Sequence, residues 1–124
     1  MTQDFRPVVY LKNGCPFCFK LRVALLEMGS IDEVEIRTFS SGTPEEAAIR
    51  ERLSGRVEKV SFPVVEISPD EFRTESDELI AHFAGQKQID PSTLPTLQAY
   101  IDGPFAKLQQ LFRENRDLKK EVSA

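Results

Sequence analysis

The two cysteines of the chain lie in one short stretch, Asn13-Gly14-Cys15-Pro16-Phe17-Cys18. A Cys-x-x-Cys pair can carry thiol–disulfide exchange, in which one thiolate attacks a disulfide and a second thiol resolves the product. We expect Cys15 to be the exposed attacking thiol. Cys18 lies about one helical turn further along, where it can reach back to Cys15, and we expect it to be the buried resolving thiol.

The elements around the pair predict why Cys15 is reactive. The apolar run Val8–Leu11 precedes it and is typical of a strand, and a helical apolar pattern that includes Leu21 and Met28 follows it. Pro16 suits the first helical position, so Cys15 is expected at or near the N-cap. Free amides and the helix dipole stabilise a thiolate there, and Lys12 is the nearest expected positive charge.

Two other uses of a Cys-x-x-Cys pair fit the chain less well. A structural zinc ion requires four ligands, and His82 is the remaining soft ligand, far along the chain. A purely structural disulfide is typical of secreted proteins, but Met1–Asp4 lacks the basic-then-apolar pattern of a secretory signal. We therefore favour redox chemistry, expect no metal, and place the protein in the cytoplasm.

Length and composition limit the class of protein. A chain of 124 residues with 40% hydrophobic residues is expected to form one core. The net charge of −4 argues against non-specific nucleic-acid binding. No stretch approaches the roughly 18 apolar residues that cross a bilayer, so we expect no membrane partner.

Local patterns predict the order β-α-β-α-β-β-α in the first 85 residues. The first two strands flank a helix and are therefore expected to be parallel. Thr43-Pro44 is a strong helix start, and Pro69-Asp70 is expected to form a type I turn. The expected elements are a strand at 7–11, a helix from 16 to Gly29, a strand at 34–39, a helix from 44 to near Gly55, strands at 64–67 and 72–74, and a helix from 75 to Gly85.

The last forty residues are predicted to form a helical extension. We expect a domain at 1–85 and an extension at 86–124, which begins with a polar linker at 86–95. A short helix at 96–101, a break at Asp102-Gly103-Pro104 and a longer amphipathic helix at 105–120 follow. Its apolar stripe consists of Phe105, Leu108 and Phe112, with Leu111 and Leu118 beside it. We expect this stripe to pack on its own domain; an exposed stripe would instead indicate a docking surface.

Three motifs carry a resemblance that spans residues from about 7 to 84. They are Gly14-Cys15-Pro16-Phe17-Cys18, Ser61-Phe62-Pro63-Val64 and Glu75-Ser76-Asp77. Together with the order of elements they resemble the thioredoxin fold, and more narrowly a glutaredoxin or the related N-terminal domain of glutathione transferases. Pro followed by an aromatic residue between the cysteines is the glutaredoxin form. The resemblance implies a mixed four-stranded sheet and a glutathione-dependent thiol–disulfide oxidoreductase that serves electron transport.

The resemblance also implies how glutathione would be held near the cysteines. Pro63 would follow a cis peptide bond, leaving the backbone N–H and C=O of Phe62 free to pair with an extended peptide. Lys12 would assist the thiolate or bind the glycine carboxylate of glutathione. Phe17 would cover the disulfide beside the sulfur atoms.

The third motif would bind the γ-glutamyl end of glutathione. The amides of Ser76 and Asp77 at a helix start, with the Ser76 hydroxyl, would bind its carboxylate. The acidic side chain of Asp77 or Glu75 would bind its ammonium group. Plain N-capping is the structural alternative for these residue types.

Several alternatives remain open on the sequence alone. Phe62 is bulkier than the valine common in glutaredoxins, and Glu75-Ser76 resembles the transferase pair, but a transferase's second domain is far longer than this extension. The reaction could use both thiols or Cys15 alone, and a minor alternative is an iron–sulfur cluster shared between chains through Cys15 and glutathione. The rival class is an adaptor that docks partners through the fold's surface and the C-terminal helix. The expected partners are glutathione and protein or small mixed disulfides, and the expected state is a monomer or weak dimer.

Overall fold

The computed structural model describes residues 5–123, with side chains in its last helix described as far as Lys119. The expectation that Met1–Asp4 is no secretory signal falls outside this range. The elements are β1 (Val8–Lys12), α1 (Pro16–Glu27), β2 (Glu35–Phe39), α2 (Pro44–Leu53), β3 (Val64–Ser68), β4 (Glu71–Thr74), α3 (Ser76–Lys87), α4 (Pro95–Tyr100) and α5 (Ala106–Ser123). Short 3-10 turns lie at Ile31–Glu33 and Pro91–Thr93, and a π turn at Ile101–Phe105. The predicted order β-α-β-α-β-β-α is confirmed.

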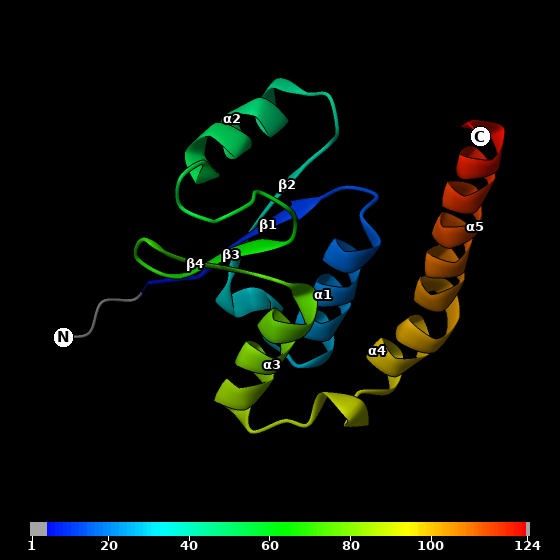
Figure 1. Ribbon diagram of the computed structural model, residues 1–124. Coiled ribbons are helices and arrows are strands. Elements are labelled where there is room, and N and C mark those ends of the chain that lie inside the picture. The colour runs from blue at the N-terminus through cyan, green and yellow to red at the C-terminus, as the bar shows by residue number, and fades with distance from the viewer. Residues whose placement is uncertain (1–4, 124) are drawn as a thin grey trace.

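The four strands form one mixed sheet in the order β2-β1-β3-β4. β1 and β2 are parallel, as their connection through a helix predicts, and β3 is antiparallel to both β1 and β4. Helix α2 covers one face of the sheet, and α1 and α3 cover the other (Figure 1). This is the thioredoxin-like fold that the sequence predicts, with a helical extension at its C-terminal end.

The central strand β1 is buried on both faces, because its side chains alternate between two apolar clusters. Val9 and Leu11 pack with the inner residues of α1 and α3. Val8 and Tyr10 pack with Leu53 at the end of α2. Packing on both faces therefore fixes the position of β1, and the C-terminal end of this strand leads into the two cysteines.

Helix α1 begins and ends where local signals predict. Pro16 is its first residue, Cys15 is its N-cap, and Gly29 follows its C-cap with a φ of +75°. Leu21, Ala24 and Leu25 of this helix are fully buried. Burial of this face keeps the N-terminus of α1, and with it Cys15, in a fixed position.

Two local predictions are wrong. The Pro69-Asp70 connection is not a type I turn, because Asp70 adopts a φ of +62°, a left-handed conformation that the tight hairpin requires and that Asp tolerates. Helix α3 does not stop at Gly85 but continues to Lys87. Gln88 then takes the left-handed position, and the N–H of Ile89 donates to the carbonyl of Ala84, which closes the helix end.

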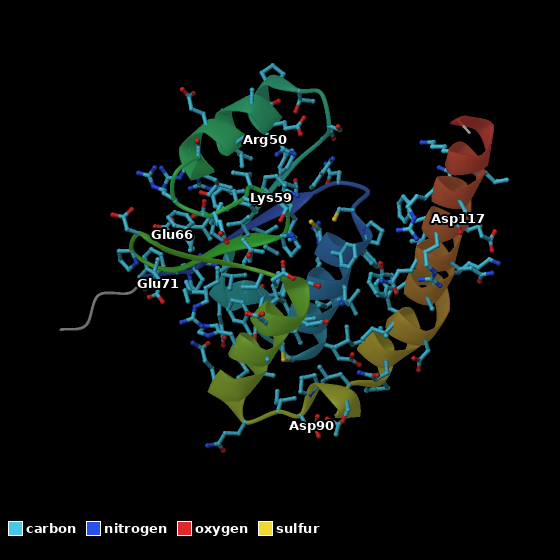
Figure 2. The ribbon with its side chains drawn as sticks, in the orientation of Figure 1. Arg50, Lys59, Glu66, Glu71, Asp90 and Asp117 are labelled. Atoms are coloured by element: carbon cyan, nitrogen blue, oxygen red, sulfur yellow. The ribbon has the colours of Figure 1, made fainter. Side chains whose placement is uncertain are left out.

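The predicted linker and the predicted break in the extension are also wrong. Leu94 is buried in the main core and Ile89 packs against it, so residues 86–95 are anchored (Figure 2 labels Asp90 in this connection). Asp102-Gly103-Pro104 does not interrupt the helix: the wider π turn at Ile101–Phe105 accommodates a proline that has no N–H to donate. The chain therefore remains helical from α4 into α5.

The expectation that the α5 stripe packs on its own domain holds only for Phe105, which is buried. Helix α5 stands to one side of the molecule, and the labelled Asp117 marks its outer part (Figures 1 and 2). The remaining stripe residues are between 38% and 60% exposed: Leu108, Leu111, Phe112 and Leu118. None of the helices in the described part of the chain is long and apolar enough to cross a membrane.

Candidate active site

The structure places the two cysteines as the sequence predicts. The Sγ of Cys15 accepts a hydrogen bond from the Cys18 N–H at 3.4 Å, as an N-cap side chain does. The Sγ of Cys18 accepts one from the Lys12 N–H at 3.3 Å. Both thiols are free; Cys18 is buried, whereas Cys15 is half-buried and lines a surface cavity. An outside disulfide can therefore reach Cys15 but not Cys18.

The surroundings of Cys15 favour its thiolate. The thiol of Cys18 donates a hydrogen bond to the Cys15 sulfur, and this contact is the main reason why the pKa of Cys15 falls to about 6. The N–H groups of Cys18 and Phe17 and the charge of Lys12 lower the pKa further, against the opposing effect of burial. The pKa of Cys18 is raised, because its proton is held by Cys15 and because it is buried. One sulfur is thus ionised at neutral pH while the other stays protonated.

This difference predicts how alkylation of Cys15 depends on pH. The rate with iodoacetamide should rise with a midpoint near pH 6 and reach a plateau above pH 7, since the reactive thiolate forms above the pKa of Cys15. Cys18→Ala removes the main donor and should move the midpoint upward by about one pH unit or more. A wild-type midpoint above pH 8 would contradict the geometry at the start of α1.

A groove of about 440 Å³ runs beside Cys15 and brings most of the predicted binding residues together. The Phe62–Pro63 bond is cis, as the resemblance implies, and the Phe62 carbonyl oxygen lies 4.0 Å from the Cys15 sulfur. The groove is lined by Phe17, Ser61, Phe62, Pro63, Glu75, Ser76, Asp77 and Glu78. Three separate motifs therefore meet on one side of the attacking sulfur.

The start of α3 at this groove has an unusual backbone. Glu75, the N-cap, adopts a φ of +76° and a ψ of 110°, although it is not glycine. Such a conformation costs energy and persists where the surrounding structure requires it, often at binding sites. It turns the chain from β4 into α3, whose first-turn amides at Ser76 and Asp77 have no partner within the helix. The groove thus offers amide donors to a ligand oxygen.

Lys20 is a residue near the groove that the sequence analysis did not assign to the site. Its ammonium group lies 2.7 Å from a carboxylate oxygen of Asp77 and 4.6 Å from the ring centroid of Phe105. The signal was present: Lys20 occupies the apolar helical face that also carries Phe17 and Ala24. A charged residue at such a position requires a partner, but the pattern does not identify which one.

A second cavity of about 270 Å³ lies at Cys15, and the sequence analysis missed it. Tyr100 and Leu108 from the extension form one wall. The Tyr100 hydroxyl donates to the Pro16 carbonyl at 2.8 Å, which fixes the extension beside the cysteine helix. Lys12 lines this cavity rather than the groove. The remaining lining residues are Leu11, Asn13, Gly14, Cys15, Pro16, Cys18, Phe19 and Arg22.

Comparisons with known proteins found distant similarities to solved structures and no matching sequence. No family model and no curated protein sequence matches the chain. A crystal structure of glutathione transferase Omega 2C from Trametes versicolor matches with 21% identity and a TM-score of 0.47, covering 86% of this chain and 46% of that one. Glutathione transferase Omega 2S from the same organism, in complex with 2,4-dihydroxybenzophenone, matches with 20% identity and a TM-score of 0.45, covering 75% and 40%. The chain thus spans less than half of either transferase.

Proposed function

We propose that the protein is a glutathione-dependent thiol–disulfide oxidoreductase in which Cys15 is the nucleophile. The observation that carries this proposal is the state of the two sulfurs: Cys15 is accessible with a pKa of about 6, beside a buried and protonated Cys18. A docking surface does not require one ionised, accessible thiol beside one protonated, buried thiol. The described residues contain no group of three or more His, Cys, Asp or Glu side chains that could hold a metal ion.

The first step is attack by the Cys15 thiolate on a disulfide that contains glutathione. A bond forms between Cys15 and the glutathione sulfur, the original disulfide bond breaks, and the other half leaves as a thiolate that takes a proton from water. A second glutathione thiolate then attacks the glutathione sulfur of this adduct, which releases oxidised glutathione and restores Cys15. With a protein disulfide, Cys15 first forms a mixed disulfide with the protein, and Cys18 then attacks the Cys15 sulfur. The bond to the protein breaks, its sulfur leaves and takes up the Cys18 proton, and a Cys15–Cys18 disulfide forms. Two glutathione molecules reduce that disulfide to the two free thiols and become oxidised glutathione.

The groove is the proposed binding site for the glutathione half. Its extended backbone would pair with the N–H and C=O of Phe62 beside the cis bond at Pro63. Its γ-glutamyl carboxylate would accept from the amides of Ser76 and Asp77. Phe17 would cover its cysteine, and Glu75 is an exposed residue of the groove lining.

The second cavity is the proposed place for the departing thiol. Cys15 is one of its lining residues, its walls are mainly apolar, and Lys12 and Arg22 also line it. The small thiol that leaves the glutathione sulfur would develop negative charge at its own sulfur, which Lys12 favours. The extension therefore contributes to the reaction through Tyr100 and Leu108, which complete the wall.

Trapping the intermediate tests the function directly. Cys18→Ser incubated with oxidised glutathione should accumulate one glutathionyl group per chain, located on Cys15 by peptide mass spectrometry, because the internal resolving thiol is missing. Adding reduced glutathione should remove the group, and the wild type should reduce a small mixed disulfide with turnover. Absence of both the adduct and turnover, with Cys15 reduced and alkylatable, would overturn the proposal.

One observation favours a second candidate, a docking module. The apolar side chains that α5 exposes, Leu108, Leu111, Phe112 and Leu118, are typical of an interaction surface. A docking module with idle cysteines would form no glutathionyl adduct in the trapping experiment. Location in the cytoplasm and a monomeric or weakly dimeric state remain proposals that accompany the enzyme.

A further inference from the structure

Lys20 is a buried cation that lies against one end of the groove. Its side chain is only 6% exposed, whereas that of its partner Asp77 is 86% exposed. The ammonium group lies 2.7 Å from Oδ1 of Asp77, 4.6 Å from the ring centroid of Phe105 and 5.7 Å from that of Phe17. Lys20 therefore links the cysteine helix, the start of α3 and the C-terminal extension.

The surroundings of Lys20 hold it in place. Phe105 is buried, and its ring meets that of Phe17 edge to face at 5.1 Å, so the ammonium group lies beside two aromatic rings that pack on each other. The faces of aromatic rings attract an ammonium group, but they do not neutralise its charge. A buried ammonium group therefore also needs an anion as an ion-pair partner. Asp77 supplies that anion. The pair is thus already formed before any ligand arrives.

This pair changes what the groove can recognise. The γ-glutamyl end of glutathione carries both an ammonium and a carboxylate group. A ligand ammonium on the free oxygen of Asp77 would share one carboxylate with Lys20 and be repelled by it. A ligand carboxylate at the first-turn amides of α3 would instead be attracted by Lys20.

We infer that Lys20 is a specificity-determining residue that makes this end of the groove a carboxylate site and suppresses recognition of the ligand's ammonium group by Asp77. The inference rests on the proposed function and names its substrate class: thiol peptides with an acidic end, for which the amino group is dispensable. It also replaces the expected role of Asp77 as the ammonium partner. Glu75 and Glu78 line the groove as well; both are exposed to solvent, as Asp77 is, so each of them attracts a ligand cation only weakly.

Titration calorimetry with two ligands tests this inference. The ligands are S-methylglutathione, which cannot exchange disulfides, and its analogue with the amino group replaced by hydrogen. The wild type should bind both with dissociation constants within about threefold of each other, the range of weak exposed ion pairs. Lys20→Met places an uncharged, unbranched side chain beside the two aromatic rings. It should increase the preference for the ligand with the amino group by about three- to fivefold.

Three further variants distinguish this role from a structural one. Lys20→Arg keeps the charge and should bind both ligands as the wild type does. Asp77→Asn added to Lys20→Met should abolish the gained preference. Lys87→Met removes a comparable ion pair between α3 and Glu33, 2.9 Å long and away from the groove, and should leave the preference unchanged. Melting curves show whether each variant is folded.

The possible failures are distinct. If the wild type strongly prefers the ligand with the amino group, or if Lys20→Met does not change the preference, the role of Lys20 is overturned. The proposed oxidoreductase function is unaffected by either result. No saturable binding of either ligand by the wild type, together with no glutathionyl adduct on Cys15, overturns the proposed function and the inference with it.

Discussion

Cys15→Ser is expected to lower the rate of glutathione-coupled reduction of a small mixed disulfide by at least about a thousandfold, toward the uncatalysed rate. A serine hydroxyl does not ionise near pH 7, whereas Cys15, with a pKa of about 6, is mostly thiolate there. The amides at the start of α1 and the charge of Lys12 then have no anion to stabilise. Steady-state kinetics with glutathione, glutathione reductase and NADPH measure the effect.

Cys18→Ser is the matched control for this prediction. It changes the same atom in the same motif, but the reaction with a small mixed disulfide can be completed by a second glutathione. We expect it to retain the activity within about tenfold, since a serine hydroxyl can still donate to the Cys15 sulfur. Equal loss in both variants would show that the reaction requires the internal disulfide, and full activity in Cys15→Ser would contradict the assignment of the nucleophile.

Local signals in the sequence were sufficient for the reactive end of α1. Pro16 marks the first turn, Gly29 marks the end, and the strand before Cys15 is apolar from Val8 to Leu11, so the N-cap position of the sulfur follows from neighbouring residues. The order of elements follows for the same reason. The cis bond at Pro63 came from the family resemblance, because an X–Pro pair alone does not reveal its isomer.

Contacts between distant residues account for what the sequence did not reveal. Lys20 meets Asp77, which lies 57 residues away, and Tyr100 meets Pro16 across 84 residues. Helical periodicity shows that Lys20 lies on an inner face, but it carries no information about the partner. The second cavity was missed because its walls come from two such distant segments. The exposed stripe of α5 was predicted to be buried because its spacing is amphipathic, and spacing does not show whether a partner surface is present.

The extension contributes to the core of the protein, which leads to a prediction about its stability. Leu97 is 1% exposed and belongs to the same apolar cluster as Leu21 and Leu25. Both carboxylate oxygens of Glu27, at the end of α1, accept N–H groups of α4 at 2.8 Å, from Thr96 and Leu97. We therefore propose that α4 folds together with the sheet. Leu97→Ala should lower the free energy of unfolding by about 3 kcal/mol, measured by urea denaturation, because it leaves a cavity in the core.

Leu111→Ala is the control, because it removes the same atoms from an exposed position on α5. It should change the free energy of unfolding by no more than about 0.5 kcal/mol. If residues 86–124 folded as a separate unit, Leu97→Ala would produce two unfolding transitions and leave that of the sheet unchanged. A single transition at lower urea would instead mean that the wall of the second cavity is as stable as the sheet. Tyr100 would then hold its place beside Cys15 for as long as the protein stays folded.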